Sequence, residues 1–165
     1  MEKILITGQD LTVEQIVAVC REHAVVELSP ESREAVLASR KIVDDLVAEK
    51  KVVYGITTGF GKFSDVVIST DECKELQKNL IITHAVGAGN PFPEDVARGM
   101  LLLRVNNLSK GYSGIRLETL ETMIAMLNKG VTPFIPEKGS LGASGDLAQP
   151  LAQVNPGDRV NDMVV

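Results

Sequence analysis

The sequence GSLGASGDLA occupies residues 139–148 of this 165-residue chain, and three of the chain's 14 glycines lie within it. Glycine is used where the backbone must bend sharply or approach another group closely. The glycines surround a tripeptide of small residues, Ala143-Ser144-Gly145. On spacing alone, this stretch is also compatible with an ordinary loop before a helix, in which the side chain of Ser144 or Asp146 caps the first turn.

A tripeptide of this composition can react with itself. The amide nitrogen of Gly145 can attack the carbonyl carbon of Ala143, and loss of water then closes a five-membered imidazolone ring. Loss of the Ser144 hydroxyl as a second water leaves an exocyclic methylene group. The product is 4-methylidene-imidazol-5-one (MIO), an electrophile built from the chain itself. Serine is needed to supply the methylene, and glycine leaves the attacking nitrogen uncrowded.

The composition beyond this stretch is that of an ordinary globular domain, with 44% hydrophobic and 24% charged residues. With a formal net charge of −5, the chain lacks the excess of basic residues that is typical of a nucleic-acid binder. The first ten residues do not form a secretory signal, and no apolar run reaches the roughly 18 residues of a membrane helix. We therefore expect a cytoplasmic protein that binds neither nucleic acid nor membrane.

Templates for nucleotide and metal sites fit this sequence poorly. Residues 59–64 (GFGKFS) lack the spacing of a phosphate-binding loop, and Gly87-Ala88-Gly89 lacks the third glycine of a dinucleotide fingerprint. The pattern around Ser144 would need glycine where Asp146 stands to form a nucleophile elbow. The two histidines lie far apart in the sequence and have no spaced partners. We expect no metal and no nucleotide.

Apolar periodicity predicts a mainly α chain without repeats or linkers. A short strand is expected at residues 3–8 and a brief extended segment at 52–54, before a glycine-rich loop. Leu101 and Leu102 make their helix apolar nearly all round, which indicates deep burial, and Val96, Met100 and Leu103 share one of its faces. Helices are predicted over residues 12–23, 30–50, 69–87, from about 94 to the bend at Gly111, and from 117 to a cap at Gly130.

Residues 139–148 closely resemble the signature of the aromatic amino acid lyases, a family of histidine, phenylalanine and tyrosine ammonia-lyases and related aminomutases. Three further stretches resemble motifs of the same family, in the same order. They are YGITTGFG (residues 54–61), similar to its tyrosine loop; NLIITHAVG (79–87), similar to its substrate-contact helix; and KGYSGIR (110–116), similar to the turn that follows. Four motifs in register are far more specific than any one alone.

The resemblance implies the N-terminal domain of the histidine ammonia-lyase/fumarase-like helical fold over residues 1–148. Residues 149–165 form a divergent tail, because Gln149 is interposed in the family's D-L-x-P pattern and the following sequence is not family-like. Family members are several times longer. We therefore expect a chain truncated before most of the central helical bundle.

The resemblance also assigns catalytic roles. In the family, the MIO formed from Ala143-Ser144-Gly145 bonds to the substrate, and Tyr54 matches the base that removes a proton from the β-carbon. A tyrosine in water loses its proton only near pH 10, roughly, so this role requires surroundings that stabilise a phenolate. Without the resemblance, Tyr54 would be interpreted as a half-buried strand aromatic.

Substrate contacts and support of ring formation follow in the same way. His84 and Gly61 match substrate-binding positions, and a histidine at position 84 suits a polar ring such as imidazole or phenol. Considered alone, His84 would be interpreted as a core histidine on a helix. Residues matching those that support MIO formation are Gly142, Asp146 and Leu147.

The context of His84 is most like the histidine ammonia-lyases, which implies conversion of L-histidine to trans-urocanate and ammonia. Two alternatives remain: a tyrosine ammonia-lyase or aminomutase with the same electrophile, and a non-catalytic helical module descended from a lyase. The expected partners are a small amino acid substrate and further copies of the chain, since family members are homotetramers whose sites are shared between subunits. The activity of the short chain alone is an open question.

Overall fold

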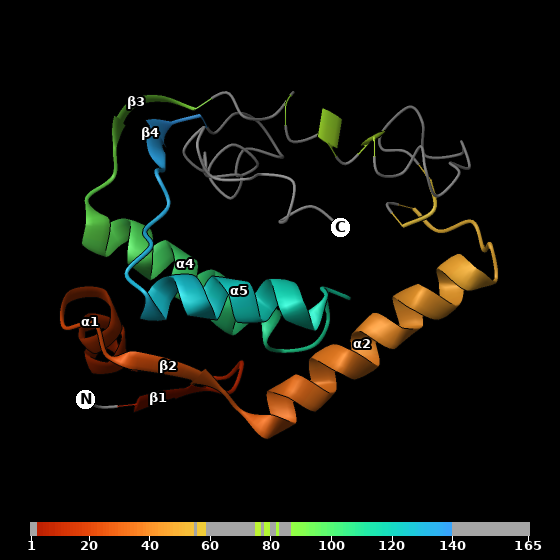
Figure 1. Cartoon of the computed structure of the whole chain (residues 1–165), viewed down its shortest axis with the longest axis horizontal. Helices are drawn as coiled ribbons and strands as arrows, with labels where there is room; N and C mark the ends of the chain where they lie inside the picture. The colour runs from red at the N-terminus through yellow and green to blue at the C-terminus, as the bar shows by residue number, and fades with distance from the viewer. Residues whose placement is uncertain are drawn as a thin grey trace. The chain divides into compact units, whose positions relative to one another are not determined.

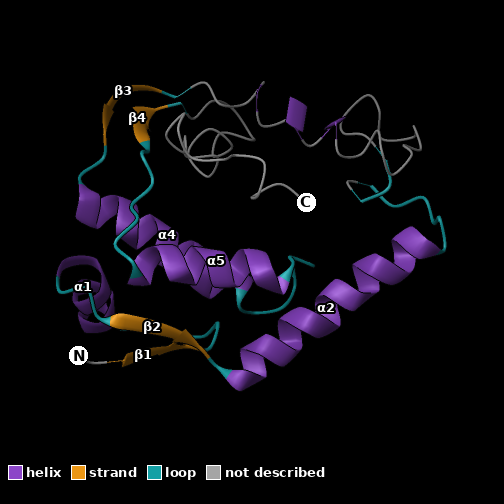
Figure 2. Cartoon of the chain, viewed as in Figure 1, coloured by secondary structure: helices purple, strands orange, loops and turns teal. Residues whose placement is uncertain are grey.

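The structure is a computed structural model in which the described residues are 3–54, 56–58, 75–76, 78–79, 82 and 87–139. The chain forms two compact units, one of Met1–Ile42 with Phe92–Phe134 and one of Val43–Pro91 with Ile135–Val165. Four helices dominate the described elements, and four short strands form two separate pairs (Figures 1 and 2). The predicted mainly α class is confirmed.

A strand–helix–strand segment opens the first unit. β1 (Lys3–Ile6) and β2 (Val25–Leu28) pair in parallel, and α1 (Val13–Arg21) connects them. α1 begins at a capping box, in which the Thr12 hydroxyl accepts from the Gln15 N–H (3.2 Å) and the Gln15 side chain accepts from the Thr12 N–H (3.0 Å). The strand and helix predicted here are confirmed, whereas β2 was not predicted.

Three longer helices follow. α2 (Pro30–Ala48) starts in the first unit and continues into the second, while α4 (Glu94–Leu108) and α5 (Leu117–Asn128) lie in the first. α2 is capped by Ser29, a buried residue whose hydroxyl accepts from the Ser32 N–H at 3.1 Å. Gly130 follows α5 with φ +69°, as expected for a C-terminal glycine. The starts of α1, α2, α4 and α5 were therefore predicted closely, whereas the start predicted near residue 69 lies outside the described residues.

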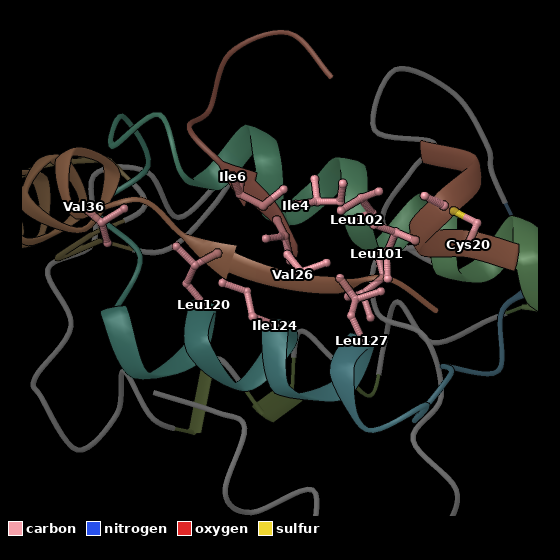
Figure 3. Packing of buried hydrophobic residues seen from close by; sticks show 14 of the residues in the cluster. Ile4, Ile6, Cys20, Val26, Val36, Leu101, Leu102, Leu120, Ile124 and Leu127 are labelled. Carbon is pink, nitrogen blue, oxygen red and sulfur yellow. The ribbon is translucent and has the colours of Figure 1, made fainter. Parts of the chain in front are cut away.

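The hydrophobic core of the first unit forms where β1, β2, α1, α4 and α5 converge (Figure 3). α4 packs against both α1 and α5, and α5 packs against β2. Removing these apolar side chains from water supplies the main driving force for folding of the unit. The residues labelled in the close view are Ile4, Ile6, Cys20, Val26, Val36, Leu101, Leu102, Leu120, Ile124 and Leu127.

α4 buries a different face from the one marked by Val96 and Leu103. Leu101 and Leu102 are buried as predicted, but Val96 is 42% exposed and Leu103 is 52% exposed. The inward face instead includes Arg98, whose side chain is fully buried. Because α4 is apolar nearly all round, periodicity could not decide which face its neighbours cover.

The guanidinium of Arg98 joins the ends of two helices. Nη2 donates to the carbonyl of Val19 in the last turn of α1 (2.9 Å), and both Nη1 and Nη2 donate to the carbonyl of Leu127 at the end of α5 (3.2 Å each). Carbonyls at a helix C-terminus lack intrahelical donors and carry partial negative charge. Arg98 therefore supplies donors to the Val19 carbonyl and to the Leu127 carbonyl, which also accepts from the Gly130 N–H (3.3 Å).

Asn128, the last residue of α5, occupies the edge of β2 that faces away from β1. Its side-chain Oδ1 accepts from the Val26 N–H (2.8 Å), and its Nδ2 donates to the Val26 carbonyl (2.9 Å). A single carboxamide thus pairs both backbone groups of a buried strand residue.

Candidate active site

The second unit contains a short antiparallel ladder between segments distant in sequence. β3 (Ala88–Pro91) pairs with β4 (Pro136–Lys138), with Ala88 opposite Lys138 and Pro91 opposite Pro136. Three steps along β3 therefore match two along β4, which is the geometry of a β-bulge. Neither strand was predicted, since glycine and proline are poor strand formers and the pairing is not local.

Two glycines allow β3 to approach β4 closely. A Cβ on Gly87 would lie 2.5 Å from Cγ of Pro136 and 2.9 Å from its Cβ, which is too close for any real contact. Gly89, within the bulge, has φ +90°, a conformation that side-chain-bearing residues rarely adopt. Gly87 was predicted to lie on the face of a helix, and this is wrong: it lies outside any helix, directly before β3.

The antiparallel direction fixes which ends of the two segments meet. The chain enters β3 at Ala88 and leaves β4 at Lys138, and these two residues are paired. In sequence, His84 precedes Ala88 by four residues, and Gly142 follows Lys138 by four. At one end of the ladder, therefore, the chain coming from His84 enters β3 beside the point where the chain going to Gly142 leaves β4.

Tyr54 lies on a turn in the same unit. The Thr57 hydroxyl accepts from the Val53 N–H (2.9 Å) and donates to the Lys51 carbonyl, while the Thr57 N–H donates to the Val53 carbonyl (3.0 Å). Tyr54 is 61% exposed. The interpretation as a half-buried strand aromatic is therefore wrong, because the backbone turns at Tyr54 and the phenol lies largely in solvent.

The remaining predicted site residues lie outside the described residues. Among the neighbours of His84, the described positions of the predicted helix are helical, namely Glu75, Leu76, Lys78, Asn79 and Ile82. Thr57 and Pro136 emerge as supporting residues that sequence reasoning missed. The undescribed site residues are Gly61, His84, Gly142, Ala143, Ser144, Gly145, Asp146 and Leu147.

Within the described part of the chain, no three His, Cys, Asp or Glu side chains gather into a group that could hold a metal ion. Among the same residues, no helix combines the length and apolar character needed to cross a bilayer.

Comparison with known proteins agrees with the resemblance carried by the sequence motifs. The family model described as aromatic amino acid lyase matches residues 11–156. A histidine ammonia-lyase of Alkaliphilus oremlandii (strain OhILAs) is 66% identical over 148 residues, which make up 90% of this chain and 29% of that protein.

Solved structures resemble the described fold as well. The histidine ammonia-lyase of Trypanosoma cruzi matches with a TM-score of 0.81 and 38% identity, over 90% of this chain and 29% of that one. The tyrosine aminomutase of Streptomyces globisporus matches with a TM-score of 0.78 and 38% identity, over 84% of this chain and 26% of that one. The chain spans 29–30% of the length of the first two curated relatives that it matches.

Proposed function

Because this chain belongs to the aromatic amino acid lyase family, we propose that it forms part of an ammonia-lyase that converts L-histidine to trans-urocanate and ammonia. The observation that carries the proposal is the 66% identity to a histidine ammonia-lyase over nine-tenths of the chain. The β3–β4 ladder supports it, since the segments bearing His84 and Ser144 are attached at one end of that ladder.

The residues present fit the MIO group that the family implies. Ala143-Ser144-Gly145 contains the serine that supplies the methylene and the glycine whose bare amide can close the ring. When formed, the group supplies an electrophile for the amine of the substrate. Gly142, Asp146 and Leu147 flank the tripeptide and are proposed to support its closure.

Tyr54 is proposed to act as the base that takes the β-proton of the substrate. Its position on a turn closed by Thr57 supports this role, because a base must present its oxygen to a substrate rather than bury it in a core. The largely exposed phenol can reach a ligand without local unfolding.

Recognition of the substrate is assigned to His84 and Gly61. A histidine at position 84 can exchange a hydrogen bond with an imidazole or a phenol, so this residue alone leaves two substrate classes. Identity to histidine ammonia-lyases favours histidine. The structural similarity to a tyrosine aminomutase keeps tyrosine as the second candidate.

The domain boundaries, the cellular location and the oligomeric state are part of the same proposal. We assign residues 1–148 to the N-terminal lyase domain and 149–165 to a separate tail. We also place the protein in the cytoplasm as a homotetramer, in which other copies complete the site.

Intact-mass measurement of the purified chain tests ring formation directly. The mass should fall below the value calculated from the sequence by two waters, and near-ultraviolet absorbance should appear. The matched control is Ser144→Ala, which cannot form the methylene because it lacks the hydroxyl. An unmodified mass for the unsubstituted chain would leave only the non-catalytic module for this chain.

Substrate choice is tested in the chain extended to the length of its relatives. The extended chain is expected to turn over histidine and release urocanate. Its Tyr54→Phe variant is expected to form the ring but to lose turnover. Turnover of tyrosine without histidine would contradict the proposed substrate.

A further inference from the structure

We propose that Thr57 is a positioning residue for Tyr54: its hydroxyl ties the turn that carries the tyrosine to the residues at the end of α2. The inference rests on the proposed function, because it takes Tyr54 to be the base that removes the β-proton of the substrate. It deepens that function by naming a residue that acts on the base through the backbone and not through the substrate.

The turn at Tyr54 is closed by two amides that share one acceptor. The Val53 carbonyl accepts from the Ile56 N–H (3.1 Å) and from the Thr57 N–H (3.0 Å). Tyr54 is the second residue of this turn, so the direction in which its side chain leaves the backbone depends on how the turn is closed. These bonds define the turn itself, and they do not connect it to the helix before it.

The connection is made by the Thr57 hydroxyl, which bonds in both directions. Its oxygen accepts from the Val53 N–H (2.9 Å), and its proton is donated to the Lys51 carbonyl. A hydroxyl offers one donor and two acceptor lone pairs, so a single side chain can pair these two backbone groups. Loss of the hydroxyl would release both groups at once.

Lys51 is in turn held by the end of α2. The Lys51 N–H donates to the Leu46 carbonyl at 3.1 Å. The Lys50 N–H donates to the Val47 carbonyl, also at 3.1 Å, which completes the Schellman pattern of helix termination. Lys50 has φ +53°, the left-handed conformation that this pattern places after a helix. The acceptor of the Thr57 proton therefore belongs to a residue that the helix end already fixes.

A path of hydrogen bonds thus leads from α2 through Lys51 and Thr57 to the turn of Tyr54. A base must bring its oxygen within hydrogen-bond reach of the proton that it removes, and a misplacement of about 1 Å can lower a rate by about 100-fold. Because Tyr54 is 61% exposed, the surrounding residues cover only the smaller part of it, and the turn has a large share in placing it.

The first experiment measures turnover of histidine in the chain extended to the length of its relatives. Thr57→Val replaces the hydroxyl with a methyl group of similar size and should lower kcat by about 10-fold to 100-fold. KM should stay nearly unchanged, because the bonds of Thr57 go to the backbone and not to the substrate. Thr57→Ser restores the hydroxyl and should recover most of the lost kcat.

Thr122→Val is the matched control in the same assay. Thr122 is exposed on α5, and its hydroxyl donates to the Glu118 carbonyl one turn earlier. The kcat of this variant should equal that of the unsubstituted chain. Intact mass checks that every variant has lost two waters, so that a lower kcat cannot come from a missing ring.

The second experiment follows amide hydrogen exchange by NMR in the 165-residue chain and does not depend on turnover. In Thr57→Val the Val53 N–H has lost its acceptor, so its exchange should accelerate by about 3-fold to 10-fold. Thr57→Ser and Thr122→Val should leave this rate unchanged. The amide of Leu102, a residue buried in the core of the first unit, should exchange equally slowly in all variants, which checks that the fold is retained.

Failure of the proposed function and failure of this inference give different results. If the unsubstituted extended chain releases no product, or if Tyr54→Phe keeps full turnover, the proposed function is wrong and the inference falls with it. If both of these tests succeed, three results show that only the role of Thr57 is wrong: an unchanged kcat in Thr57→Val, no recovery in Thr57→Ser, or unchanged exchange at Val53.

Discussion

Arg98 brings a permanent charge into the apolar core of the first unit. Its donors meet carbonyls in the last turns of α1 and α5, where the helix dipoles are negative. A single side chain therefore provides both hydrogen bonds and charge compensation at the meeting point of two helix ends.

Arg98→Met should lower the free energy of unfolding by about 2 kcal/mol, because the carbonyl of Val19 would remain buried without its donor and that of Leu127 would keep only backbone donors. Urea titration measures the change. Arg104→Met, on the exposed surface of the same helix, is the control and should stay within about 0.5 kcal/mol. Equal losses in the two variants would contradict this role for Arg98.

Burial raises the pKa of the Cys20 thiol, and nearby Asp95 acts in the same direction, against the opposing effects of Arg98 and Arg21. The folded state therefore favours the protonated thiol. This stabilisation is fully present below about pH 8.5, where an unfolded cysteine begins to titrate, and is lost as pH rises through the folded pKa.

The difference in unfolding free energy between the unsubstituted chain and Cys20→Ala should accordingly shrink as pH rises from about 8 to 10. Denaturant titrations at matched pH values measure it, and Cys73 is common to both proteins. A difference that grows with pH would contradict the raised pKa.

At the scale of elements, α1 depends on its capping box. Thr12→Ala removes the acceptor for the Gln15 N–H and should cost about 1 kcal/mol of stability. Thr122→Ala is a matched control, because Thr122 lies within α5 and its hydroxyl only donates to the Glu118 carbonyl one turn earlier. Thermal unfolding compares them, and a larger loss for Thr122→Ala would count against the cap.

The helices were predictable because their apolar residues recur at helical spacing and their starts carry local signals, as at Ser29-Pro30. β2 was not, since a four-residue strand shows little periodicity and its partner β1 lies beyond a whole helix. β3 contains Gly89 and Pro91, which argue against a strand locally. Such elements are determined by packing between distant segments rather than by their own sequence.

At the scale of the whole molecule, the two units should differ in local stability. The described core cluster lies in the first unit, so amides of α4 and α5 should be the last to exchange with deuterium. Peptides covering the Tyr54 turn and β3 should exchange much earlier. Hydrogen-exchange mass spectrometry tests this, and equal protection would indicate one cooperative unit instead.

The candidate site was predictable as a set of residues and much less so as an arrangement. Motif order is what points to Tyr54, His84 and Ser144 as candidate site residues, since the proposed roles rest on their place in the motifs. The ladder to which the segments of His84 and Ser144 are attached left no such signal: Gly87 was predicted to lie in a helix. Close backbone contact is a property of two segments, and neither sequence shows it alone.

Asn128 has a consequence for how the folded chain meets other chains. An unpaired strand edge is a template on which a second molecule can add a strand and start aggregation. At Val26 both backbone groups are already bound by the carboxamide of Asn128. The end of α5 thus protects the edge of β2 at Val26 against pairing with a strand of another molecule. The two strands of the sheet could not provide this protection themselves.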